Sequence, residues 1–232
     1  MVLSQIPGQP FFKWSWVGDH VDLIGQQLLE HVELTVLAVA IGLVISFPLG
    51  VVAYRRQWFY GPVTWVTGIL YTIPSLALFV ALQPITGLST TSAEIGLVSY
   101  TLLILIRNIV TGLRGVPADT KEAARGMGYT DRQMLWKVEL PLAVPAILAG
   151  VRIATVTTIG LVTVTALIGK GGLGYLILQG FERFFQTETI VGGVLSIVLA
   201  VVADALLLLA ARLLTPWARR TRARSRAGVR EL

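Results

Sequence analysis

Residues 32–53 read VELTVLAVAIGLVISFPLGVVA, and this stretch decides the class of fold. Apart from Glu33 at its edge, the stretch carries no charge. A helix needs about 20 apolar residues to cross a hydrocarbon core of roughly 30 Å, so this run is long enough to span a bilayer. A single run of this kind also occurs as a buried helix of a soluble protein, so the number of such runs matters.

Four further apolar runs follow, at residues 62–82, 95–113, 143–168 and 190–214. The whole chain is 54% hydrophobic and only 14% charged, whereas a typical soluble domain is roughly 25% charged. This balance excludes a disordered chain, a nucleic-acid-binding tail protein and most soluble enzymes. We therefore predict an all-α integral membrane protein with five transmembrane helices, forming one domain over residues 32–214.

The distribution of lysine and arginine predicts the orientation, because cytoplasmic loops carry an excess of both. With the N-terminus outside, the inner side receives most of these residues, at 55–56, 114–137 and 212–230. The outer side then receives only Lys13, Lys170 and Arg183. We expect residues 215–232 to form a basic cytoplasmic tail that contacts anionic lipid rather than nucleic acid.

Residues 1–31 contain several charges and are expected to form an external or interfacial segment. Its aromatic side chains either lie at the membrane interface or pack against the bundle. They are Phe11, Phe12, Trp14 and Trp16.

Sequence signals for catalysis or for cofactor and metal binding are weak. The chain has no cysteine and two histidines, so thiolate metal sites and disulfides are excluded. Residues 169–174, GKGGLG, match G-x-G-x-x-G, but an apolar span precedes them where a dinucleotide site needs a strand. The phosphate-binding pattern G-x-x-x-x-G-K-[ST] does not occur. We predict a non-enzymatic chain that holds no cofactor or metal.

The connection between the third and fourth runs predicts a compact helical hairpin. Asp119 and Glu122 have the spacing of a capping box, so a short helix should run from about Thr120 to Met127. Gly128 suits the left-handed residue that ends a helix. A second box at 130–133 should open another short helix, and Pro141 and Pro145 should set the entry into the fourth span. Such a hairpin is either a well-capped surface loop or a docking site for a soluble partner.

Residues 122–141 carry a family resemblance. Glu122-Ala123-Ala124, three residues, Gly128, nine residues and then Val138-Glu139-Leu140-Pro141 resemble the EAA loop of binding-protein-dependent ABC importer permeases. The family pattern has Ile where this chain has Val138. The resemblance covers the five spans and the predicted orientation, and it identifies residues 117–141 as a cytoplasmic coupling loop.

The resemblance implies a machine of several chains in a bacterial cytoplasmic membrane. It implies a second permease chain, identical or homologous, a cytoplasmic ABC ATPase dimer that binds ATP and Mg, and a substrate-binding protein outside. The ATPase-coupling residues are then Glu122, Ala123, Ala124, Gly128, Leu140 and Pro141. In this interpretation the chain itself hydrolyses no ATP and translocates substrate by alternating access.

A narrower resemblance concerns the substrate. Residues 71–78 (YTIPSLAL), 126–130 (GMGYT) and 166–174 (ALIGKGGLG) resemble permeases for osmoprotectants. Those permeases import glycine betaine, carnitine, choline or proline betaine. Methionine permeases carry a related Gly-Gly-Leu-Gly stretch, so a methionine importer is the alternative. More distant alternatives are a membrane-embedded enzyme and a passive osmotic channel.

Three charged residues, Arg107, Arg152 and Asp204, lie within apolar runs. Each costs about 3 kcal/mol in a membrane, so each should find a partner or water. We expect Asp204 to pair with Arg152 or Arg107, either to hold helices together or to line a pathway.

Further pathway candidates are polar or kinked positions: Tyr71, Pro74, Ser75 and Thr158. The aromatic faces of Trp65, Tyr71 and Phe79 suit a quaternary ammonium ion, although packing against lipid explains these three side chains equally well.

Overall fold

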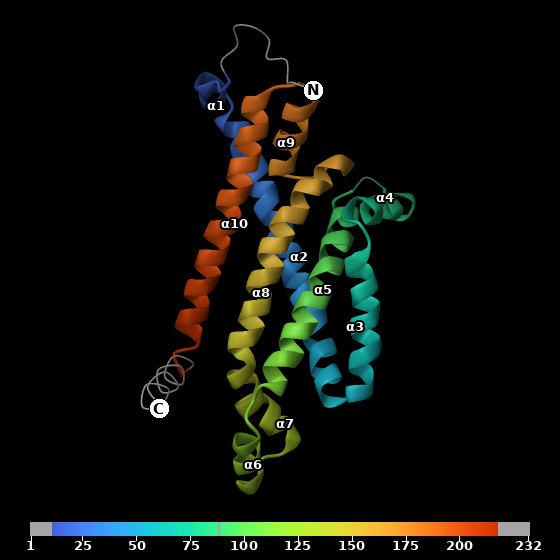
Figure 1. Cartoon of the computed structure of the whole chain (residues 1–232), viewed down its shortest axis with the longest axis vertical. Coiled ribbons are helices and arrows are strands. Elements are labelled where there is room, and N and C mark those ends of the chain that lie inside the picture. Colours follow the sequence, from blue (N-terminus) through green and yellow to red (C-terminus); the bar gives the residue numbers. More distant parts are fainter. Residues whose placement is uncertain (1–10, 88, 218–232) are drawn as a thin grey trace, which may run out of the picture.

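The computed structural model describes residues 11–87 and 89–217, and within these ranges every regular element is a helix. Four helices are long and apolar enough to cross a membrane, and a bent pair of helices brings the number of candidate spans to five (Figure 1). The prediction of an all-helical protein with about five spans is therefore confirmed. The positively charged tail predicted from Arg219 onward lies outside the described residues.

The helices follow one another with short connections. Their bounds are α1 Trp14–Asp19, α2 Val21–Arg55, α3 Gln57–Thr72, α4 Ser75–Thr86, α5 Thr90–Arg114, α6 Ala118–Gly126, α7 Asp131–Met134, α8 Leu140–Val162, α9 Leu173–Glu182 and α10 Gln186–Leu214. A π-helical turn, Leu135–Glu139, joins α7 to α8, and a 3₁₀ segment, Thr163–Ile168, extends α8.

Helices α2, α5 and α8 form the centre of the bundle. Small residues let them approach closely: a Cβ on Gly50 of α2 would lie 2.7 Å from the side chain of Ile109 on α5. In the same way, a Cβ on Gly150 of α8 would lie 2.5 Å from Asn108. Close approach through small residues is the usual way in which membrane helices gain packing energy.

The apolar run 62–82 does not form one straight helix. It is divided between α3 and α4, which meet at an angle of 96°. Pro74 lacks an N–H and disfavours the helical conformation of the residue before it, and Ile73 is accordingly extended, with ψ 129°. The Tyr100 hydroxyl of α5 donates a hydrogen bond to the Ile73 carbonyl at this break.

The N-terminal segment packs against the bundle. Helix α2 begins at Val21, well before the first apolar run, and α1 precedes it directly. Phe12 and Trp16 contact the cluster that Leu173, Leu176 and Val191 form on α9 and α10, whereas Phe11 and Trp14 are exposed. Packing against the bundle, one of the two outcomes that the sequence left open, therefore holds for Phe12 and Trp16, and a position of Phe11 and Trp14 at the membrane interface stays a prediction.

Candidate functional site

The predicted hairpin consists of α6, a turn at Gly128 and α7, and lies at one end of the molecule, beside the ends of α2 and α5 and the start of α8 (Figure 1). Gly128 has φ +80°, as predicted for the residue that ends the first helix. Its N–H bonds the Arg125 carbonyl at 2.9 Å, and the N–H of Tyr129 bonds the Ala124 carbonyl at 3.1 Å. The turn is therefore tightly closed.

One of the two predicted capping boxes is present. Thr130 accepts a bond from the Gln133 N–H at 3.3 Å, and the Gln133 side chain accepts from the Thr130 N–H at 2.9 Å. The box at Asp119 was wrong: α6 begins at Ala118, two residues early, with Pro117 at its N-cap and no side-chain cap. The fixed φ of Pro117 suits a helix start, so Asp119 falls in the first turn, where a carboxylate still favours the helix dipole.

The second helix of the hairpin continues directly into the fourth span. α7, the π-helical turn, α8 and the 3₁₀ segment form one continuous helical stretch from Asp131 to Ile168. Pro141 cannot donate to the residue four positions before it, and the wider π-turn directly precedes it. Leu140 is buried against Ile109 and Leu113 of α5, so the start of α8 is held firmly on the bundle.

The hairpin separates its candidate coupling residues into an outer and an inner set. Glu122, Ala123 and Gly128 are exposed on its surface, and Met127 beside them is exposed as well. Ala124 is only 1% exposed and packs inward. A docked partner would therefore meet Glu122 and Ala123, while Ala124 contributes to the packing of the hairpin itself.

A polar cluster at the base of the hairpin, which we call the brace, consists of Tyr54, Arg55, Lys121 and Glu139. The Tyr54 hydroxyl donates to Glu139 Oε1 at 2.6 Å and accepts from Lys121 Nζ at 3.0 Å. Lys121 Nζ lies 3.8 Å from Glu139 Oε1, and an Arg55 guanidinium nitrogen lies 3.6 Å from Glu139 Oε2. The Glu139 side chain is only 4% exposed, so its charge depends on these partners.

The brace joins both helices of the hairpin to the end of α2. Lys121 belongs to α6, and Arg55 of α2 also donates to the backbone carbonyl of Asp131 on α7 at 2.7 Å. Sequence reasoning missed Glu139. Its one signal is a carboxylate placed between the short second helix and the proline-rich, apolar start of the fourth span.

The expected intramembrane ion pair is present between α8 and α10. Arg152 Nε and a terminal guanidinium nitrogen donate to the two oxygens of Asp204 at 2.9 and 2.8 Å. This two-pronged geometry is the strong form of an arginine–carboxylate contact. Arg107 does not join the pair, and it makes no hydrogen bond or ion pair with any residue that the structure describes.

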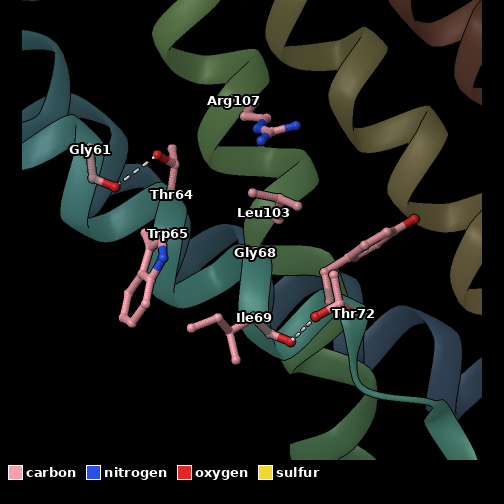
Figure 2. A pocket seen from close by; sticks show the side chains of 9 residues that line it. Gly61, Thr64, Trp65, Gly68, Ile69, Thr72, Leu103 and Arg107 are labelled. Atoms are coloured by element: carbon pink, nitrogen blue, oxygen red, sulfur yellow. Dashed lines mark hydrogen bonds between the residues drawn. The ribbon is translucent and has the colours of Figure 1, made fainter.

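The four pathway candidates lie in different surroundings. Thr158 is buried within α8, and Pro74 and Ser75 stand at the break between α3 and α4. Tyr71 lines an open groove between α3 and α5 with a volume of about 680 Å³, together with Trp65 and Arg107 (Figure 2). Phe79 is fully buried against Gly96, so its face is closed to a ligand.

His31 is a second residue that the sequence did not single out. It is fully buried at the end of the bundle opposite the hairpin. Its Nδ1 accepts from the Leu173 N–H at 3.3 Å, so Nε2 carries the proton and donates to the Ile159 carbonyl at 3.0 Å. The ring thus ties α2 to α8 and α9. No group of three His, Cys, Asp or Glu side chains in the described part of the chain is placed to hold a metal ion.

Comparison with known families gives one match over most of the chain. Residues 36–220 match the family described as "Binding-protein-dependent transport system inner membrane component". The match covers the bundle and the hairpin.

Two relatives come from Bacillus subtilis. The choline transport system permease protein OpuBB is 39% identical over 188 residues, which are 81% of this chain and 86% of the relative. The glycine betaine/carnitine/choline transport system permease protein OpuCB is 36% identical over the same shares of the two chains.

Among solved structures, a chain of the MetNI methionine ABC transporter in an inward-facing conformation has a TM-score of 0.78 and 25% identity. The match covers 85% of this chain and 98% of that chain.

Proposed function

This chain belongs to the family of binding-protein-dependent transport system inner membrane components, and we propose that it carries quaternary-amine osmoprotectants through a bacterial inner membrane. It is an ABC importer permease subunit and a multi-pass membrane protein, and its relatives are transport subunits rather than enzymes. The substrate class, the partners and the mechanism belong to the proposal.

The main support for the mechanism in this proposal is the hairpin, which the brace holds against the end of α2. We assign the hairpin end of the bundle to the cytoplasm, where the exposed Glu122 and Ala123 meet a groove on an ATPase subunit. ATP and Mg bind to that ATPase dimer and not to this chain. Because the brace joins the hairpin to α2, closure of the ATPase dimer would pull on the centre of the bundle as well as on the hairpin.

Alternating access then needs a second permease chain, identical or homologous, facing this one. The two bundles would rock between outward-open and inward-open forms, and a substrate-binding protein outside would deliver the solute. The break between α3 and α4 supports this proposal, because non-helical backbone at membrane depth is tolerated where it is buried in protein or lines a cavity.

The names of the relatives support the substrate class. OpuBB is named for choline, and OpuCB for glycine betaine, carnitine and choline. A methionine importer is the second candidate, because the MetNI chain shares the fold over 85% of this chain. The identity to the osmoprotectant permeases, 39% and 36% against 25%, favours the first candidate.

Uptake of labelled solutes tests the substrate class. Cells with and without this gene, grown at high osmolarity, are given glycine betaine, choline, carnitine or methionine. We expect gene-dependent uptake of at least one quaternary amine and none of methionine. Uptake of methionine alone would support the assignment as an importer but contradict the proposed substrate class.

A further inference from the structure

The groove lies between α5, which is a candidate membrane span, and α3, which is the first half of the bent candidate span. One wall is α3, where the lining residues recur at helical spacing from Gly61 to Thr72, and the other wall is α5, with Leu103 and Arg107 (Figure 2). Its volume of about 680 Å³ is in the range of small-molecule sites, although the groove is open to the surface rather than enclosed. The groove is therefore large enough for a solute of the size of carnitine.

Arg107 gives this groove a charge for which residues 11–87 and 89–217 provide no hydrogen-bond or ion-pair partner. Its side chain is exposed, and no described residue bonds it. It stands seven residues before Arg114, the last residue of α5, which places it about 10 Å along the helix from that end. The Cα–Cβ bonds of a helix tilt toward its N-terminus, so the Arg107 side chain leaves α5 in the direction away from Arg114. Arg152, by contrast, is fully paired with Asp204.

The α3 wall offers aromatic faces and few free polar groups. Trp65 is 69% exposed, and Tyr71 packs edge-on against Tyr100 at 5.9 Å between ring centroids. The hydroxyls of Thr64 and Thr72 both donate to carbonyls of their own helix, at 2.7 and 2.8 Å. A ligand in the groove would therefore meet aromatic faces on one wall and a guanidinium on the other.

We propose that this groove is a substrate station on the translocation path, in which Arg107 binds the carboxylate of a zwitterionic quaternary amine. This inference rests on the function proposed above and adds a binding site for the two ends of the substrate. A guanidinium binds a carboxylate through two parallel hydrogen bonds, and the trimethylammonium end suits the faces of Trp65 and Tyr71. Glycine betaine and carnitine have both groups, whereas choline has a hydroxyl in place of the carboxylate.

The consequence is a difference between substrates. Arg107 attracts the carboxylate of glycine betaine and carnitine, and it only repels the net positive charge of choline. Removal of its charge should therefore slow the uptake of the two zwitterions and leave choline uptake the same or faster. A residue that merely holds helices together would affect all three solutes alike.

The test is uptake of labelled glycine betaine, carnitine and choline by the complete transporter, in cells that lack other carriers for these solutes. The variants are Arg107→Gln and Arg107→Lys, with rates divided by the amount of permease in the membrane. We expect Arg107→Gln to lower zwitterion uptake about tenfold or more, as for the loss of a charged hydrogen bond, with choline changed less than about twofold. Arg107→Lys should be intermediate, because it keeps the charge and loses the two-pronged geometry.

Aromatic variants test the other wall. Trp65→Leu and Tyr71→Leu should lower uptake of all three solutes, because all three carry the trimethylammonium group. The matched control is Trp58→Leu, which removes a tryptophan of α3 that is 71% exposed but does not line the groove. It should leave uptake unchanged.

The outcomes separate the two proposals. A wild type that moves none of the solutes overturns the proposed function and this inference together. A wild type that moves choline alone, or an Arg107→Gln variant that lowers all three rates equally or none of them, overturns only the substrate station. An equal loss would mean that Arg107 meets a lipid phosphate or a carboxylate of the second permease.

Discussion

Tyr54 at the end of α2 donates a hydrogen bond of 2.6 Å to Glu139, which lies just before α8. This contact joins two helices of the central bundle at the point where the hairpin begins. Because Lys121 of the hairpin bonds the same hydroxyl at 3.0 Å, this hydroxyl connects the hairpin to both α2 and the start of α8.

The first prediction concerns this contact. Tyr54→Phe should cost about 1.5–3 kcal/mol of stability, as for hydrogen bonds to charged groups, and should lower the amount of solute carried per ATP hydrolysed. The measurement is the ratio of uptake to ATP hydrolysis in the purified transporter. The control is Asp131→Asn, because the Asp131 side chain is 87% exposed and lies 4.0 Å from Arg55. An unchanged ratio in Tyr54→Phe would show that the brace has no part in coupling.

The second prediction concerns the turn of the hairpin. Gly128 has φ +80°, so Gly128→Ala should strain the turn by about 1–2 kcal/mol, and Gly128→Pro should disrupt it. The ATPase should then co-purify with the variant permease less well. Gly126→Ala is the control, because Gly126 is helical and a Cβ there has open space. Equal recovery of the ATPase with all these variants would argue against the hairpin as its docking site.

The third prediction concerns the pair between α8 and α10. Either Arg152→Gln or Asp204→Asn should lower the thermal midpoint, since each leaves the other member without its partner. The double variant should cost less than the sum of the two single changes, because the second change removes no further contact. Strictly additive losses would mean that the two side chains act independently.

The fourth prediction concerns His31. Its replacement by alanine leaves the buried Leu173 N–H, at the start of α9, without its side-chain acceptor at a cost of about 1–3 kcal/mol, and also removes the bond to the Ile159 carbonyl. We expect a lower thermal midpoint in detergent. His20→Ala should have little effect, because His20 bonds only the Trp16 carbonyl of its own segment, at 2.8 Å. A stable His31→Ala variant would mean that other contacts hold α9 in place.

The fifth prediction concerns orientation in the membrane, and the absence of cysteine makes the test direct. Ala123→Cys on the hairpin should react with a membrane-impermeant maleimide only from the cytoplasmic side. Phe184→Cys, at an exposed position between α9 and α10, should react only from outside. The reverse labelling pattern would show that the topology is opposite to the one that the distribution of lysine and arginine predicts.

The sequence predicted those features that depend on local composition. Apolar length predicted the long helices, and the spacing of Thr130 and Gln133 predicted a cap that the structure contains. The cost of charges in a bilayer predicted that Asp204 pairs with Arg152 or Arg107, and the structure shows Arg152 as the partner. In each case the physical cause lies in one segment, or in a small number of groups that have few alternatives.

The sequence did not predict features that depend on how separate segments pack against one another. Pro74 indicated a kink, but the angle of 96° depends on how α4 packs across α5. Asp119 has the spacing of a cap, and the conformation of Pro117 decided the helix start instead. Glu139 acquires its partners from α2 and α6, which are distant in the chain, so its local position could not reveal them.

The most direct test of the account is ATP-dependent accumulation of solute in proteoliposomes that contain the complete transporter, with labelled glycine betaine and choline outside. We predict accumulation against a gradient when ATP and Mg are present on the ATPase side, and none when ATP is left out or Gly128→Pro replaces the wild type. Equal uptake without ATP, ending when the two sides are equal, would contradict the account and indicate a passive channel.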